Sequence, residues 1–115
     1  MTITTTQTRW TTVCRLDDLL PGRGAAALLG EQQVAVFRLA GGTVRAIGNQ
    51  DPVSGAHVLS RGIVGTRGGR PVVASPMHKQ VYDLETGACL DVPTVSVPVF
   101  ATRVRDGLVH VAVNP

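Results

Sequence analysis

The chain has 115 residues, of which 43% are hydrophobic and 17% charged, so one globular domain is expected and a disordered chain is excluded. No stretch of about 18 apolar residues is present, which excludes a helical membrane span. Eleven Lys and Arg against eight Asp and Glu give a net charge of +3, without a basic run that would indicate nucleic-acid binding. Ten of the eleven are arginines, whose planar groups suit carboxylates or phosphates, so an acidic partner surface is expected.

Two cysteines, Cys14 and Cys89, are too few for a disulfide scaffold and too far apart in sequence for a zinc motif. We therefore expect free thiols and a cytoplasmic location. Residues 1–9 are rich in threonine and lack the basic start and apolar stretch of a secretory signal. They are expected to form a flexible tail before a single domain over residues 10–115.

The first part of the domain shows short β-branched runs separated by glycine and proline. A strand is expected at residues 10–15, followed by one helical turn at 16–20 that Pro21-Gly22 ends. The Gly-bracketed run 25–29 is too short for a stable helix and is interpreted as a strand. Residues 33–39 and 43–47 then form a hairpin around Gly41-Gly42. Alternation along its first strand places Val34 and Val36 on one face and Ala35 and Phe37 on the other.

The second part contains two further hairpins and two polar loops. Residues 48–60 are a long loop rich in Asn, Asp, Pro, Ser and Gly, and 76–79 are a shorter one. The remaining expected elements are strands 63–66 and 72–75 joined by Arg67-Gly68-Gly69-Arg70, a strand at 80–84, a turn at 85–87, a brief strand at 88–91, and strands 99–105 and 108–113 joined by Asp106-Gly107. The prediction is an all-β fold, a small sandwich or barrel of eight to ten short antiparallel strands.

Motifs for catalysis are missing from the sequence. It lacks G-x-S-x-G and the glycine-rich phosphate loops, and no cysteine or serine has a histidine at a spacing that specifies a catalytic pair. Of the three histidines, His110 lies in the last strand and is expected to be a surface or interface side chain. His57 and His78 fall in the two polar loops. No catalytic residue is predicted.

The two loops resemble those of Rieske-type ferredoxins, which carry C-x-H in one loop and C-P-x-H-G in the other. In that family two thiolates and two imidazoles hold a two-iron cluster. The resemblance places Asp51 at the first cysteine, Val53 at the first histidine and Ser75 at the second cysteine, and keeps only His78. It therefore implies that the cluster is lost and that this chain has no cofactor-binding or metal-binding residues. A single divalent ion on His78 and Asp51 is the weaker alternative, because two donors hold a metal poorly.

A narrower resemblance extends from Trp10 to Val113. It rests on four blocks in order: Asn49-Gln50-Asp51-Pro52 with Gly55-Ala56, Arg61-Gly62-Ile63-Val64-Gly65, Ala74-Ser75-Pro76-Met77-His78-Lys79-Gln80, and Thr86-Gly87-Ala88-Cys89-Leu90. These blocks resemble the small subunits of NAD(P)H-dependent assimilatory nitrite reductase. The resemblance implies a Rieske-like fold without its cluster and a non-catalytic role in nitrate assimilation. It also implies a partner, a large subunit that carries FAD, an iron–sulfur centre and sirohaem and reduces nitrite to ammonia.

Loop tips on a rigid β scaffold commonly contact partners, so the two vestigial cluster loops are the predicted docking residues. They are Asn49, Asp51, Pro52, Val53, Gly55, Ser75, Pro76, His78, Lys79 and Gln80. Asp51 and Lys79 are hypothesised to form an ion pair or hydrogen-bonded cluster that bridges the loops in place of the iron; the alternative is that both are solvated surface charges.

A patch of Arg61, Arg67 and Arg70 that would attract anions is a further hypothesis, set against ordinary solvated arginines.

Two other functions stay open at this point. A free-standing Rieske-type ferredoxin would need substitute ligands, and Cys14 and Cys89 lie outside the paired loops. A small basic β-barrel that binds nucleic acid would need exposed aromatic side chains, and the chain has only four aromatic residues: Trp10, Phe37, Tyr82 and Phe100.

Overall fold

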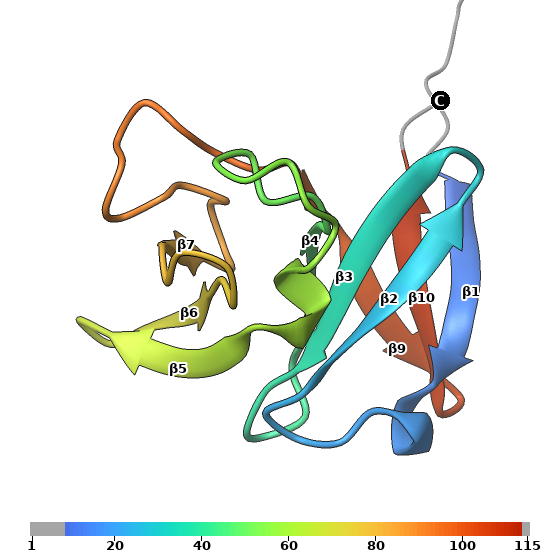
Figure 1. The fold of residues 1–115 in the computed structure, drawn as a ribbon. Coiled ribbons are helices and arrows are strands. Elements are labelled where there is room, and N and C mark those ends of the chain that lie inside the picture. The colour runs from blue at the N-terminus through green and yellow to red at the C-terminus, as the bar shows by residue number, and fades with distance from the viewer. Residues whose placement is uncertain (1–8, 114–115) are drawn as a thin grey trace, which may run out of the picture.

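The computed structural model describes residues 9–113, which form ten strands in three antiparallel sheets (Figure 1). The first sheet has the order β1-β10-β9, with β1 at Arg9–Arg15, β9 at Thr102–Arg105 and β10 at Leu108–Val113. The second has the order β2-β3-β4-β8, with β2 at Gly24–Leu29, β3 at Gln32–Arg38, β4 at Val44–Gly48 and β8 at Val99–Phe100. The third has the order β5-β6-β7, with β5 at Ile63–Arg67, β6 at Arg70–Ala74 and β7 at Val81–Asp83. Two short 3₁₀ turns, η1 at Leu16–Asp18 and η2 at Leu59–Arg61, complete the described elements.

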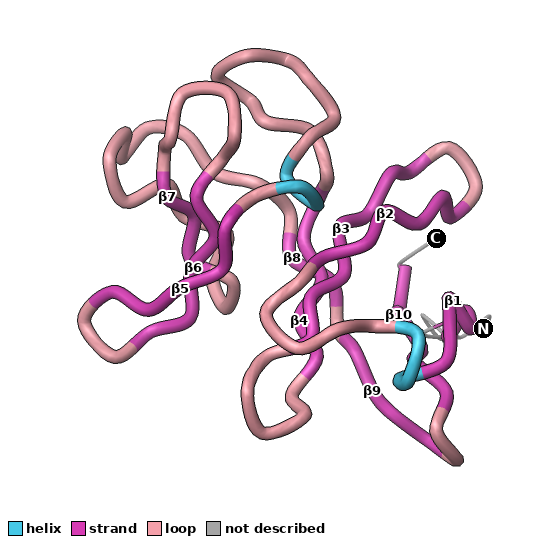
Figure 2. Tube along the Cα trace, turned by 60° about the horizontal axis from the view of Figure 1, so that its bottom comes forward, coloured by secondary structure: helices cyan, strands magenta, loops and turns pink. Residues whose placement is uncertain are grey.

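The sheets are arranged in two lobes. The first and second sheets pack together as a base lobe, and β5, β6 and β7 form a small lobe beside it (Figures 1 and 2). No helix in the described residues is long and apolar enough to span a membrane. The all-β prediction is confirmed.

Strand β3 connects the two hydrophobic cores because both of its faces are buried. Val34 and Val36 pack with the base-lobe core that includes residues of β10, whereas Ala35 and Phe37 pack with a second core. That second core contains Leu59, Val73, Tyr82, Leu84 and Cys89 and so reaches into the small lobe. The face assignment made from the alternation of β3 is therefore confirmed. Because one face of β3 packs in each hydrophobic core, this strand joins the interiors of the two lobes.

Two predicted segments differ from the structure by more than a small shift of an element's end. The expected strand 99–105 is interrupted at Ala101, because β8 pairs with β4 whereas β9 pairs with β10 in a different sheet. The expected strand 88–91 is reduced to isolated bridges, Tyr82 to Cys89 and Ala88 to Ser96. The predicted tail 1–9 falls mostly on residues outside those described, but Arg9 already pairs with β10 in strand β1.

Candidate functional site

The two polar loops of the sequence meet in space. The first loop, residues 49–58, follows β4, and the second loop, residues 75–80, connects β6 to β7. The Ser75 hydroxyl donates a hydrogen bond to Asp51 Oδ2 at 2.5 Å, between residues 24 positions apart. Both side chains are buried, with Asp51 0% and Ser75 2% exposed. The two positions that the resemblance assigns to lost cysteines are therefore joined directly to each other.

Asp51 is also the acceptor for three further groups. Tyr82, on β7, donates its hydroxyl to Asp51 Oδ1 at 3.1 Å, and the backbone N–H groups of Val53 and Ser54 donate to the same oxygen at 2.9 Å and 3.5 Å. The backbone of the first loop turns around this point, since Gly55 N–H donates to the Asp51 carbonyl and Asp51 N–H to the Ala56 carbonyl. We call Asp51, Ser75 and Tyr82 the buried triad. It links both loops to the small-lobe sheet.

The buried carboxylate is kept ionised by its donors. Burial alone would raise the pKa of Asp51, but the hydrogen bonds from Ser75, Val53 and Tyr82 outweigh it and lower the pKa below its ordinary value. Burial and the neighbouring Asp51 charge raise the pKa of Tyr82, so the phenol stays protonated. The triad is thus a fully satisfied polar network, which rigidifies its surroundings instead of supplying a free acid or base.

Asn49 closes the first loop onto its neighbours. Its side-chain amide donates to the His57 carbonyl at 3.2 Å and to the Gln33 side chain at 3.4 Å. Its side-chain oxygen accepts the backbone N–H of Ser60 at 2.8 Å. Asn49 is 2% exposed, so it acts as a structural clamp at the base of the loop.

The hypothesised bridge between Asp51 and Lys79 is wrong. Lys79 is exposed at the end of the second loop, and no ion pair within residues 9–113 includes it. Lys79 also takes a positive φ of 62°, which is uncommon for a side-chain-bearing residue, and its N–H donates to the Ser75 carbonyl in the turn. The neutral hydroxyl of Ser75 provides the bridge because it fits in the buried space beside the carboxylate, whereas a lysine head there would lose its water.

The ten predicted docking residues differ in burial. Asn49, Asp51 and Ser75 are buried, Gln80 is half-buried, and the six exposed ones are Pro52, Val53, Gly55, Pro76, His78 and Lys79. Val53 is 41% exposed, and Met77, which the prediction did not include, is 50% exposed. His78 is exposed and Asp51 is buried beneath its donors, so these two residues do not form the alternative two-donor metal site.

The residues present do not fit a two-iron cluster. Such a cluster needs four strong donors, and the described residues contain no close group of three or more His, Cys, Asp or Glu side chains. Asp51 and Ser75 use their oxygens on each other. Cys14 lies in β1 of the base lobe, and Cys89 is buried in the second core as a free thiol.

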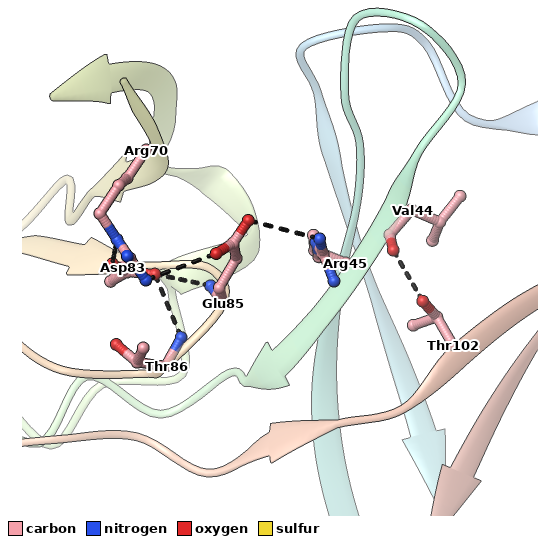
Figure 3. A network of polar contacts seen from close by, with 7 residues as sticks. All are labelled: Val44, Arg45, Arg70, Asp83, Glu85, Thr86 and Thr102. Atoms are coloured by element: carbon pink, nitrogen blue, oxygen red, sulfur yellow. Dashed lines mark hydrogen bonds and ion pairs between the residues drawn. The ribbon is translucent and has the colours of Figure 1, made fainter. Parts of the chain in front are cut away.

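A second polar network surrounds the turn after β7 (Figure 3). Arg70 Nε donates to Asp83 Oδ2 at 2.5 Å, and the other oxygen of Asp83 accepts the backbone N–H groups of Glu85 and Thr86. Burial alone would raise the pKa of Asp83, but these hydrogen bonds lower it. Glu85 pairs with both Arg70 and Arg45 at 3.4 Å, which joins the small lobe to β4 of the base lobe.

These pairs correct the predicted arginine patch. Arg67 pairs with Asp91 at 3.2 Å and Arg70 with Asp83 and Glu85, so two of its three members are already neutralised within the chain. Of these three arginines, Arg61 alone has no carboxylate partner among residues 9–113. The sequence did carry a signal for the pairing of Arg70, namely the acidic residues of the turn Asp83-Leu84-Glu85-Thr86. An Asp at the start of a turn commonly accepts the backbone N–H groups of the residues that follow it.

Tyr82 is a member of the buried triad that the sequence did not single out. It was only counted among the four aromatic residues, and its ring is fully buried. A buried tyrosine hydroxyl needs a hydrogen-bond partner, so a tyrosine in a short apolar strand opposite a polar loop was a usable signal.

Comparisons with known proteins agree with this geometry. Residues 9–112 match the family described as the Rieske-like [2Fe-2S] domain. The chain is 44% identical over 103 residues to the nitrite reductase (NADH) small subunit of Salmonella typhimurium, covering 89% of this chain and 95% of that protein. A crystal structure described as a putative NADH-dependent nitrite reductase small subunit from Mycobacterium tuberculosis superimposes with a TM-score of 0.91 at 54% identity, covering 95% of this chain and 98% of that one.

In a third relative the similar sequence is part of a much longer chain. The chain is 41% identical over 102 residues to the nitrite reductase [NAD(P)H] large subunit of Klebsiella oxytoca, and this match covers 89% of this chain but only 11% of that protein. A segment of that large subunit therefore resembles most of this chain. On the fold, the site and these matches, the chain belongs to the Rieske-like [2Fe-2S] domain family and, within it, to the small subunits of nitrite reductase.

Proposed function

We propose that this chain is the non-catalytic small subunit of an NAD(P)H-dependent nitrite reductase, acting in the cytoplasm in nitrate assimilation. The observation that carries the proposal is the Klebsiella oxytoca relative, in which a segment like this chain is part of the large-subunit polypeptide. Where two proteins occur elsewhere as one chain, the separate copies have reason to associate. The large subunit would hold the FAD, iron–sulfur centre and sirohaem that the resemblance implies, and this chain would hold no cofactor.

The donor chemistry of the loops favours a docking role over electron transfer. The buried triad occupies the space between the loops with a closed hydrogen-bond network. It holds the loop backbone rigid without metal, and the exposed tips carry Val53, Met77, His78 and Lys79. A rigid scaffold that presents apolar and basic tips suits contact with another protein, because little conformational entropy is lost on binding. We propose that these tips dock on the large subunit.

Nucleic-acid binding finds no support in the aromatic side chains. Phe37 and Tyr82 are fully buried, and Phe100 is half-buried against the base-lobe core. The guanidinium of Arg103 covers the ring of half-buried Trp10 at 4.3 Å and donates to Nδ1 of His110, which is itself half-buried. No aromatic ring is therefore left as a stacking platform for bases.

The experiment that tests the proposal is nitrite-dependent NAD(P)H oxidation by the isolated large subunit, with this chain titrated in from zero to excess. Saturable stimulation, or saturable binding measured by biolayer interferometry, is expected. Absence of both would contradict the proposal.

The docking face is tested by Val53→Asp, matched with Val104→Asp on β9, since the two valines are 41% and 39% exposed. The loop-tip variant is expected to weaken binding about tenfold or more, because it places a charge in an apolar contact, and the β9 variant by less than about twofold. Equal effects of the two variants would remove the loop tips as the docking face.

A further inference from the structure

A second surface stands apart from the loop tips. A groove of about 510 Å³ runs between the chain segment before β2, the turn η2 and the start of β5. It continues into a wider groove of about 550 Å³, with which it shares Gly22 and Val64. In Figure 1 the start of β2 and strand β5 lie low in the molecule, whereas the first loop lies at the top. We call the two together the edge groove.

The charge of the narrower part is unbalanced. Arg23 and Arg61 are its only charged lining residues, and both are exposed. All eight Asp and Glu of the chain lie within residues 9–113, yet none of the ion pairs there includes either arginine. Arg45, Arg67 and Arg70, by contrast, each pair with a carboxylate. Two like charges without a counter-charge from their own chain create a local positive potential that attracts an anionic group.

Close packing of η2 against Gly24 brings these two arginines to the same groove. A Cβ on Gly24 would lie 2.6 Å from both the Phe37 ring and the Ser60 carbonyl oxygen. Glycine therefore lets η2 pack directly against the start of β2. Because Arg23 immediately precedes Gly24 and Arg61 ends η2, this approach places both side chains on one groove.

The backbone around the groove is suited to an extended peptide. In the described sheets β5 and β2 are both edge strands, since each pairs on one side only. β5 lines both parts of the groove, from Ile63 to Thr66. Ile63 is 78% exposed, the largest exposure among the large hydrophobic side chains of the described chain. An exposed edge strand beside an apolar side chain is a template for adding a strand from another chain.

We infer that the edge groove binds an extended acidic segment of the large subunit, which lies along β5, places carboxylates on Arg23 and Arg61, and covers Ile63. This inference rests on the proposed function, since it names a second contact with the same partner. A phosphate polymer fits less well, because the two arginines without an ion-pair partner lie beside an apolar side chain and an unpaired strand edge, and no aromatic residue lines the groove.

Charge reversal tests the electrostatic part. Binding of the full chain to the large subunit is measured by biolayer interferometry for Arg23→Glu and Arg61→Glu, with Arg105→Glu as the matched control. Arg105 is an exposed arginine of β9 that also makes no ion pair within the described residues. Each groove variant is expected to weaken binding about tenfold and the control less than about twofold, because only the groove variants repel the bound carboxylates.

The occupant is identified by crosslinking. A photoreactive benzoylphenylalanine placed at Ile63, whose exposure leaves room for it, is expected to crosslink to a large-subunit peptide rich in Asp and Glu. A crosslinked peptide without that excess of acidic residues, or none at all, would overturn the inference, as would binding of an oligonucleotide that depends on Arg23 and Arg61.

The two proposals fail in different ways. If the unmodified chain does not bind the large subunit, the proposed function and this inference both fall. If it binds and Val53→Asp weakens binding but the groove variants do not, only the edge groove is refuted.

Discussion

Removing the Asp51 carboxylate is the most direct test of the structure, because the whole bridge between the loops depends on one side chain. Asp51→Ala leaves the buried hydroxyls of Ser75 and Tyr82 without an acceptor, and it also removes the acceptor of the partly buried backbone N–H groups of Val53 and Ser54. Asp51→Asn keeps the volume and one acceptor oxygen, but it places an amide nitrogen or a neutral oxygen where the charged oxygen had been.

The magnitude follows from the cost of unsatisfied buried groups. Each of the two buried hydroxyls left without a partner costs about 1–3 kcal/mol, so Asp51→Ala is expected to lower the free energy of unfolding by about 2–6 kcal/mol and Asp51→Asn by about 1–3 kcal/mol. Domains of this size have a total stability of about 5–15 kcal/mol, so the alanine variant approaches the limit of folding. The asparagine variant is the one that can be measured in full.

Urea denaturation at neutral pH, followed by circular dichroism, gives both values. Asp17→Asn, at an exposed residue of η1, serves as the control and is expected to change stability by less than about 0.5 kcal/mol. A cycle of Asp51→Asn, Ser75→Ala and the double variant isolates the interaction between the loops. Additive single effects, or an Asp51→Asn change no larger than that of the control, would refute the bridging role.

The same carboxylate gives a pH dependence with a definite sign. Because the folded-state pKa of Asp51 is lowered, its contribution to stability is fully present above the ordinary value of about 3.9 and is lost as the pH falls through the folded value. Asp51→Asn is therefore expected to flatten the acid decline below about pH 4. Part of the decline remains, because the pKa of Asp83 is lowered as well.

Three further predictions concern other parts of the chain. Gly87 has a φ of +78°, and a Cβ there would lie 2.1 Å from a backbone carbonyl oxygen, whereas Gly30 has a φ of +63° and no atom within 4 Å of such a Cβ. Gly30→Ala is expected to lower the free energy of unfolding by about 1–2 kcal/mol and Gly87→Ala by more, and equal losses in thermal denaturation would contradict this. Arg70→Met leaves the buried carboxylate of Asp83 without its ion-pair partner and is expected to lower the free energy of unfolding by about 1–3 kcal/mol. Arg67→Met removes an ion pair between exposed groups and is expected to lower it by less than about 1 kcal/mol, and the reverse order in urea denaturation would show that burial does not govern the strength of these pairs. Protein purified without oxygen is expected to be colourless and free of iron, and a measured content near about two irons per chain would mean that our account of the loop donors is mistaken.

Local pattern was sufficient for most of the strands. The glycine turns at Gly41-Gly42 and Gly68-Gly69 and the Asp106-Gly107 turn each lie between paired strands, as expected from their backbone preferences. The pattern failed at Ala101, where a run without Gly or Pro crosses from one sheet to another. A run of strand-forming residues indicates extended backbone but not its pairing partner.

Residue type and family resemblance predicted a candidate site in two loops. The structure brings Asp51 and Ser75 of these loops into contact, but the pair predicted within them was wrong. Lysine and aspartate were the obvious pair by charge. Burial decided otherwise: the space beside Asp51 accepts the small hydroxyl of Ser75 and the ring of Tyr82, and Lys79 remains in solvent.

The sequence by itself determined the all-β class, which residues share each face of β3, the positions of the loops and the family. These follow from nearest-neighbour spacing and from motifs that are read along the chain. Only the tertiary structure decided that Asp51 meets Ser75 and Tyr82, 24 and 31 residues away, and that Arg23 joins Arg61 in one groove while Arg67 and Arg70 are neutralised. Such contacts depend on how sheets pack against each other, and the periodicity of a single strand carries no information about that packing.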